Sequence, residues 1–227
     1  EFFCSLMNCD INNSDKLSVY CHEVKKLGFS VISPDISSSE TEFLVIDNEN
    51  GDKSISFGLG ALKNIGESSI KEIIRDRERN GKFKNFSDLL QRISNNVLNK
   101  KILEALIFSN SLKSLEVNQK FLNDKIDDII SLNSHYHKNL NIHQNTLFVE
   151  ENLFDERLNS TDYDSWSEEY KLEKEVEVIG FYLSEHPTKK LKLAFQGLEV
   201  KNLSNLKDQI NKPNMLSESY IAVINEI

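Results

Sequence analysis

The stretch Gly58–Ser69, GLGALKNIGESS, lies between a strand-like run and a helical pattern, and its glycines decide how the chain is interpreted. Glycines that connect a strand to a helix N-terminus often hold a phosphate. A P-loop is excluded because five residues, rather than four, separate Gly60 from Gly66, and Glu67 stands where the lysine is required. The dinucleotide fingerprint is excluded because Lys63 occupies its third glycine position. The stretch is therefore not a loop for a nucleotide cofactor.

A helix-hairpin-helix fits the same stretch better: a short helix, a tight turn at Ile65-Gly66 and a basic helix. The turn glycine lets the backbone approach a phosphate, and the next helix offers free amides at the positive end of its dipole. Asn64 stands where such hairpins usually carry a first glycine, and asparagine tolerates the left-handed conformation. The predicted ligand is the DNA backbone, held without reading its sequence. From these residues alone, an ordinary helical hairpin with a glycine turn is an equally good interpretation.

The charge distribution supports a local nucleic-acid contact in a chain that is acidic as a whole. The net charge is −9, which by itself favours an all-α interaction module that does not bind DNA. Residues 59–115, however, contain eleven Lys or Arg and six acids, a balance of 11 − 6 = +5, so the remainder carries −9 − 5 = −14. Lys63, Lys71 and the series Arg75, Arg77 and Arg79 are the basic residues expected to attract DNA. A mixed, solvated helix face explains the same charges equally well.

The first quarter of the chain predicts helices and short strands. Residues 2–7 suggest the end of one helix. A second helix covers residues 17–27, with a cap at 12–14 and Gly28 just after its end. Strands are predicted at 29–32, 41–47 and 54–58, and the last two are joined by the turn Asp47–Asp52.

The rest of the chain is predicted to be mainly helical. Three apolar stripes with helical spacing follow the glycine stretch; their members are Ile70, Ile73 and Ile74, then Phe86, Leu89, Leu90 and Ile93, then Ile102, Leu103, Leu106 and Ile107. Residues 133–165 are polar with weak periodicity and predict a long exposed linker. Ser165 and Glu168 predict a capping box for a final helix that ends near His186-Pro187. The fold class is mainly α with a small β portion.

Composition limits the remaining classes of function. Hydrophobic residues make up 39% and charged residues 28%, and no apolar run reaches the roughly 18 residues that span a bilayer. The cysteines Cys4, Cys9 and Cys21 lack metal-ligand spacing and are odd in number, which favours reduced thiols in the cytoplasm. The five histidines likewise show no metal spacing.

Trp166 and the pair Phe181-Tyr182 could stack on bases, but their helical spacing favours core packing. Because the chain opens at Glu1 and stops inside a strand-like run, we interpret it as a piece of a longer protein.

Four segments in the same order resemble the alpha subunits of bacterial DNA polymerase III. They are LGFSVISPDIS, SISFGLGALKNIGESSIKEII, LNKKILEALI and EKEVEVIGFYLSEHP. The resemblance implies four regions: the end of the fingers domain at 1–58, a tandem helix-hairpin-helix at 59–115, the remainder of a clamp-binding region with its linker at 116–215, and the first strand of an OB domain at 216–227.

The resemblance also implies site residues and partners. The implied DNA-binding residues are Lys63, Asn64, Ile65, Gly66, Lys71 and Arg75. The motif QNTLF, residues 144–148, is similar to the family's internal motif for the sliding clamp (the beta subunit), with Gln144, Thr146, Leu147 and Phe148 as the implied contacts. Further implied partners are primer–template DNA and the other holoenzyme subunits, with no membrane partner. The two Mg²⁺ ions of nucleotidyl transfer belong, by the same resemblance, to carboxylates outside these residues, so no catalytic residue, metal ligand or cofactor is expected within 1–227.

Two functions from different classes follow. The first is a segment of a replicative DNA-directed DNA polymerase, a nucleotidyltransferase. The alternative is a non-enzymatic helix-hairpin-helix scaffold that binds DNA and docks on a clamp.

Overall fold

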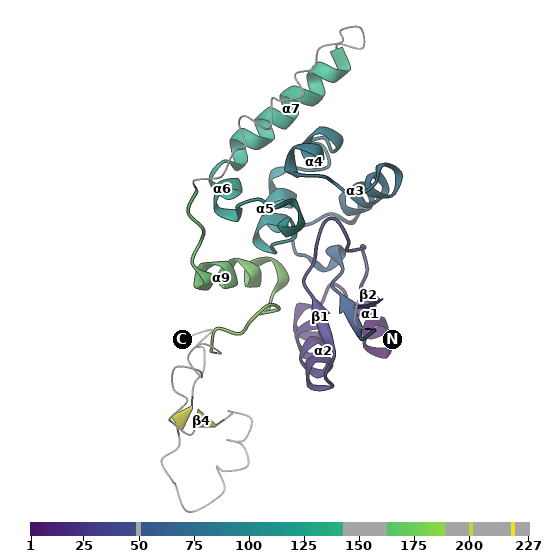
Figure 1. Ribbon diagram of the computed structural model, residues 1–227, viewed down its shortest axis with the longest axis vertical. Coiled ribbons are helices and arrows are strands. Elements are labelled where there is room, and N and C mark those ends of the chain that lie inside the picture. The colour runs from purple at the N-terminus through teal and green to yellow at the C-terminus, as the bar shows by residue number, and fades with distance from the viewer. Residues whose placement is uncertain (49–50, 143–162, 189–199, 202–218, 221–227) are drawn as a thin grey trace, which may run out of the picture. The chain divides into compact units, whose positions relative to one another are not determined.

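The computed structural model describes residues 1–48, 51–142, 163–188, 200–201 and 219–220 (Figure 1). They fall into two compact units, Glu1–Leu183 and Ser184–Ile227. The elements of the first unit are α1 (Phe2–Cys9), α2 (Ser14–Lys26), β1 (Ser30–Ile32), β2 (Leu44–Asp47), β3 (Lys53–Ser56), η1 (Leu59–Ala61), α3 (Glu67–Asn80), α4 (Phe86–Arg92), α5 (Lys100–Phe108), η2 (Lys113–Leu115), α6 (Gln119–Asp124), α7 (Ile126–Ile142) and α9 (Glu168–Ile179). The second unit contains the parallel pair β4 (Val200–Lys201) and β5 (Ser219–Tyr220). The predicted class, mainly α with a small β portion, is confirmed.

Asparagine side chains start four of the helices in the first unit. Each accepts a hydrogen bond from the backbone amide three residues further on, which satisfies one of the free donors of the first turn; the caps are Asn13, Asn85, Asn99 and Asn118. For α2 the predicted cap range and the predicted glycine after the end are confirmed, since Gly28 takes a φ of +85°. These ends are fixed by residues that are close together in the sequence.

A three-stranded sheet with the order β1-β3-β2 lies beside α1 and α2 (Figure 1). β2 and β3 are antiparallel, with Asp47 opposite Lys53, so the predicted hairpin is confirmed. β1 runs parallel to β3, with Ser30 opposite Ser54. Strand β2 was predicted to begin at residue 41 but begins at Leu44, because the carbonyl of Thr41 accepts from the amide of Gly60 instead of pairing in the sheet.

One continuous core joins the sheet, its helices and the helical part of the first unit. The rings of Phe43 and Phe57 lie 4.8 Å apart in the centre of it, and both are fully buried. Phe181 packs on Phe57 at 6.5 Å, and Trp166 packs on Phe108 at 6.0 Å. The prediction of core packing for Trp166 and Phe181 is therefore confirmed.

The linker predicted from residue 133 is wrong for its first ten residues, because α7 continues to Ile142. Asn133 is fully buried and its amide donates to the carbonyls of Leu90 (2.7 Å) and Ile93 (3.0 Å) at the end of α4. The Nε2 of His137 lies 3.0 Å from the same Leu90 oxygen. Polar side chains of α7 thus satisfy carbonyls that the last turn of α4 leaves free. Residues 143–162 lie outside the described residues.

Both predicted ends of the last helix were misplaced. Ser167, rather than Ser165, is the N-cap of α9, and its hydroxyl accepts from the amide of Tyr170 at 3.2 Å. The helix ends at Ile179 rather than near His186, because Gly180 takes a left-handed φ of +98° and closes it. Gly180 therefore closes the helix several residues before Pro187.

Candidate DNA-backbone interface

The glycines of the GLG stretch serve backbone packing. A Cβ on Gly58 would lie 2.7 Å from the carbonyl carbon of Glu42, and a Cβ on Gly60 would lie 2.7 Å from the carbonyl oxygen of Thr41. The amides of Leu59 and Gly60 donate to the carbonyls of Glu40 (2.8 Å) and Thr41 (2.9 Å). Only glycine allows two backbone segments to approach this closely. These two glycines are therefore occupied by the fold and do not hold a ligand.

The hairpin itself is the turn Lys63–Gly66 that leads into α3. Asn64 takes a left-handed φ of +66°, as predicted for a residue that stands where such hairpins usually carry a glycine. Ile65 is partly buried against the core and anchors the turn, while Lys63, Asn64 and Gly66 are exposed. Gly66 is the N-cap of α3, has a φ of −76°, and has no atom within 3.9 Å of the place where a Cβ would be added. The side of the hairpin that carries Gly66 is open.

Free backbone amides lie at this open side. Within the described part of the chain, the amides of Gly66, Glu67 and Ser68 donate to no protein group, whereas the amides of Ser69 and Ile70 return to the carbonyl of Gly66. The positive end of the α3 dipole adds to their attraction for an anion. This arrangement can bind one phosphate group without touching a base.

The hairpin is held from behind by α9. The amide of Lys63 donates to the carbonyl of Val178 at 2.7 Å, and the Lys63 ammonium lies beside Gly180, 2.9 Å from the place of an added Cβ. The same added Cβ would lie 2.5 Å from the Cβ of Ser14. Residues 14, 63 and 180 thus meet at one point. The sequence does not predict this support, because nothing near residue 63 indicates a partner more than a hundred residues away.

The predicted basic residues separate into two groups. Lys63, Lys71 and Arg75 are exposed, and Lys71 pairs with Glu67 one turn earlier. The hydrogen bond from Lys71 is the main reason that the pKa of Glu67 lies below its usual value, with the attraction of the Lys71 charge second. Lys71 therefore offsets the one carboxylate in the first turn of α3, which would otherwise repel a phosphate.

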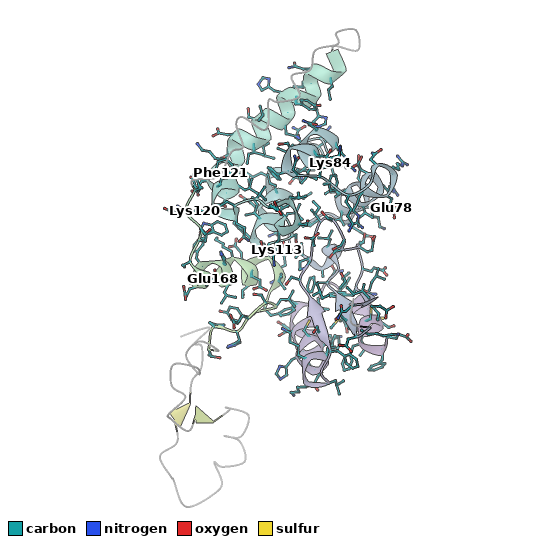
Figure 2. The ribbon with its side chains drawn as sticks, in the orientation of Figure 1. Glu78, Lys84, Lys113, Lys120, Phe121 and Glu168 are labelled. Carbon is teal, nitrogen blue, oxygen red and sulfur yellow. The ribbon has the colours of Figure 1, made fainter. Side chains whose placement is uncertain are left out.

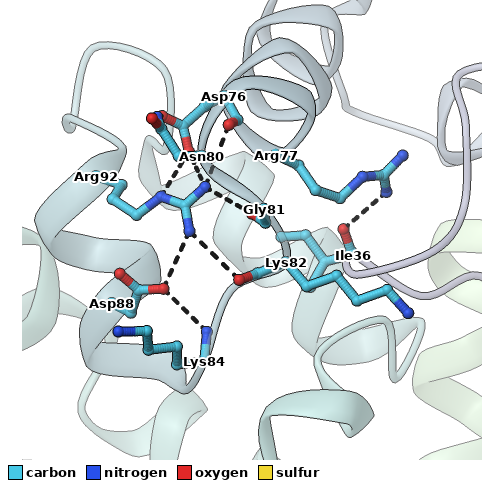
Figure 3. A network of polar contacts seen from close by, with 9 residues as sticks. All are labelled: Ile36, Asp76, Arg77, Asn80, Gly81, Lys82, Lys84, Asp88 and Arg92. Carbon is cyan, nitrogen blue, oxygen red and sulfur yellow. Dashed lines mark hydrogen bonds and ion pairs between the residues drawn. The ribbon is translucent and has the colours of Figure 1, made fainter.

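Arg77 does not belong to a DNA-binding series, contrary to the sequence analysis. It is 8% exposed, and its guanidinium donates to the carbonyl of Ile36 at 3.0 Å (Figure 3). The same guanidinium donates to the carbonyl of Ser39 (2.7 Å) and to the carboxylate of Glu40. Arg77 follows Ile70, Ile73 and Ile74 on the buried stripe of α3, and this spacing was the available signal for its role.

Arg92 is also committed to the fold. Its guanidinium donates to the carboxylates of Asp76 and Asp88 and to the carbonyl of Gly81 (Figure 3). It also lies 4.3 Å from the centre of the Phe83 ring. These contacts close the connection between α3 and α4. Among the other basic residues of 59–115, Lys84 and Lys113 lie apart from each other on the helical region (Figure 2). The local charge of +5 is therefore not one continuous patch.

The described residues contain no cluster of three or more His, Cys, Asp or Glu that could hold a metal ion. None of the described helices is long and apolar enough to cross a membrane. Residues Gln144, Thr146, Leu147 and Phe148, implied as clamp contacts, lie outside the described residues.

Comparison with known proteins finds similarity over the region that contains this hairpin. Residues 28–122 match the family model described as a helix-hairpin-helix motif. The chain is 37% identical over 205 residues to the DNA polymerase III subunit alpha of Borreliella burgdorferi, 33% identical over 216 residues to that of Buchnera aphidicola, and 33% identical over 211 residues to that of Neisseria meningitidis.

The chain is homologous to one segment of the DNA polymerase III alpha subunit. The three matches cover 89%, 91% and 92% of this chain but only 17%, 18% and 18% of those relatives. The chain thus spans about a sixth of the length of the curated alpha subunits that it matches, and the matched helix-hairpin-helix region contains the turn with the free amides.

Proposed function

We propose that this chain binds the backbone of duplex DNA through the hairpin Lys63–Gly66 and the first turn of α3, as one segment of a replicative DNA polymerase. The observation that carries the proposal is the set of free amides at Gly66, Glu67 and Ser68 beside an N-cap with no side chain. The contact uses backbone donors and a helix dipole, so it holds a phosphate irrespective of sequence. Such a contact suits an enzyme that must advance along any template.

The other residues of the interface have distinct parts in this proposal. Ile65 fixes the turn on the core, and Asn64 supplies the left-handed residue that brings the amides to one side. Lys63 and Lys71 add attraction to the phosphate backbone, which is screened by salt. We assign nucleotidyl transfer, with its two Mg²⁺ ions, to a polypeptide with the length of the alpha subunits. We assign no residue of this chain to that reaction.

We further propose that Gln144–Phe148 docks on the sliding clamp, on the sequence of the motif alone. Two adjacent apolar side chains, Leu147 and Phe148, can fill separate pockets, and the Gln144 amide can bond to a polar rim. The same assignment makes primer–template DNA and the other holoenzyme subunits the partners, and the cytoplasm the location. The homology to alpha subunits supports this function over the non-enzymatic scaffold.

The test is DNA binding by the whole chain, because residues 59–115 share their core with α1, α2 and α9. Fluorescence anisotropy with duplexes of two unrelated sequences is expected to give equal affinities and a log–log salt slope of about −2 to −4. Gly66→Val should greatly weaken binding at low salt, because its φ accepts a side chain that then covers the amides. Ser5→Val, which adds a valine side chain at an exposed position of α1, should leave binding unchanged. Equal binding by the wild type and Gly66→Val would contradict the proposal.

A further inference from the structure

A groove of about 500 Å³ lies along α3, away from the hairpin. Its walls are the exposed face of α3, the connection between α4 and α5, and one residue of α7. Arg75 and Arg79 lie in the α3 wall, Ile93 and Val97 lie in the connection between α4 and α5, and His137 is the residue of α7.

Part of this lining is already fixed by internal contacts. Arg92 and Asp76 neutralise each other, and Asn80 donates to Asp76 at 2.7 Å, so these three side chains form a rigid wall (Figure 3). Ile93 and Val97 are buried and form an apolar floor. His137 is held in place by the contact of its Nε2 with the Leu90 oxygen. The groove therefore exists before any ligand enters it.

Two guanidinium groups in the groove are uncommitted. Arg75 and Arg79 are one turn apart on the same face of α3, both are exposed, and neither forms an ion pair within the described residues. Glu72 is the one remaining acid of the lining, since Asp76 is paired with Arg92. Guanidinium groups on a fixed scaffold recognise phosphate oxygens in a bidentate manner. The chemistry of the groove thus favours a phosphate group.

We propose that this groove, through Arg75 and Arg79, binds a second phosphate of the same DNA duplex that the hairpin binds; the inference rests on the proposed function. Nine and thirteen residues separate Gly66 from the two arginines. At 1.5 Å per residue the two contacts are about 14–20 Å apart along α3. One phosphate cannot reach both places, so α3 makes contact with the backbone near each of its ends. The hairpin contact uses amides and the groove contact uses charge.

The experiment measures the salt dependence of duplex binding by the whole chain and compares Arg75→Gln/Arg79→Gln with the wild type. Because each neutralised phosphate contributes about −0.9 to the log–log slope, the slope of the double variant should be weaker by about 1. Arg75→Lys/Arg79→Lys should retain the slope but bind more weakly at low salt, since lysine cannot form the bidentate contact. The matched control, Lys26→Gln/Lys53→Gln, removes the same charge outside residues 59–115 and should retain the wild-type slope.

The outcomes separate the two proposals. The groove inference is wrong if Arg75→Gln/Arg79→Gln has the same salt slope as the control Lys26→Gln/Lys53→Gln. The proposed function still stands in that case, provided that the wild type binds duplex DNA and Gly66→Val does not. If the wild type shows no salt-dependent binding at all, the proposed function fails and the groove inference fails with it. Equal thermal midpoints are expected for the arginine and lysine variants because the changed side chains are exposed.

Discussion

At the scale of single residues, Arg75 and Arg77 show that neighbours of the same type have opposite roles. The guanidinium of Arg77 connects α3 to the segment Ile36–Glu40, whereas Arg75 extends into solvent. Burying a charge is stabilising only when its donors are satisfied, and here carbonyls and a carboxylate satisfy them.

We expect Arg77→Met to lower the free energy of unfolding by about 2–4 kcal/mol, because buried carbonyl oxygens lose their donor. Arg75→Met, the control, should change it by less than about 0.5 kcal/mol. Urea unfolding followed by circular dichroism measures both. If the two variants are equally stable, Arg77 does not connect the helix to that segment.

The three cysteines should differ in reactivity. Burial raises the pKa of Cys21 to about 12, and burial is also the main cause that raises the pKa of Cys4, so both thiols are protonated at pH 8. A protonated, buried thiol does not attack a disulfide reagent, whereas Cys9 is exposed. Ellman's reagent should therefore label one thiol rapidly in the folded chain and three after denaturation. Cys9→Ser should remove the rapid reaction; rapid labelling of two thiols in that variant would be inconsistent with the core.

At the scale of elements, the connection from β3 to α3 contains three glycines with two different purposes. Gly58 and Gly60 allow the close approach of residues 40–43, and Gly66 leaves the start of α3 open. The first purpose concerns stability and the second concerns a ligand, so substitutions distinguish them.

Gly58→Ala should destabilise the chain by about 1–3 kcal/mol, because the added methyl meets backbone atoms that cannot move independently. Gly66→Ala should cost less than about 1 kcal/mol, since its added methyl has open space and only the cap preference changes. Thermal unfolding and DNA binding are measured in parallel. The expected pattern is reciprocal: Gly58→Ala loses stability, and Gly66→Ala loses more DNA affinity than stability. A stable Gly58→Ala variant would refute the packing role.

At the scale of the whole molecule, the chain joins a DNA contact and a proposed clamp contact in one polypeptide. If Gln144–Phe148 docks as a short peptide, burial of each apolar side chain contributes about 1.5–3 kcal/mol, which implies binding of about micromolar strength. Attachment to DNA raises the effective concentration and allows weak contacts to act together.

Leu147→Ala with Phe148→Ala should abolish binding to the sliding clamp in calorimetry and leave the thermal midpoint almost unchanged. The control is Leu153→Ala with Phe154→Ala, a similar pair a few residues further on, which should retain clamp binding. A large fall in midpoint with clamp affinity intact would mean that Leu147 and Phe148 belong to the core instead.

The sequence alone determined the local features of this protein. The apolar stripes of α3, α4 and α5, the β2–β3 hairpin, the cap of α2 and the left-handed Asn64 were all predictable. Each depends on residues within a few positions of one another, whose spacing and side-chain chemistry act on the backbone directly.

The tertiary structure alone decided which residues remain free for a ligand. It assigned Gly58 and Gly60 to packing and Arg77 and Arg92 to internal bonds, and it extended α7 through a polar stretch. Each of these depends on partners that are distant in sequence or on a neighbouring turn, such as the carbonyl of Leu90 in α4, which accepts from Asn133 across more than forty residues. The physical reason is that hydrogen bonding and close packing depend on which groups meet in space. Local periodicity indicates which face of a helix is buried, but it does not identify the group that this face meets.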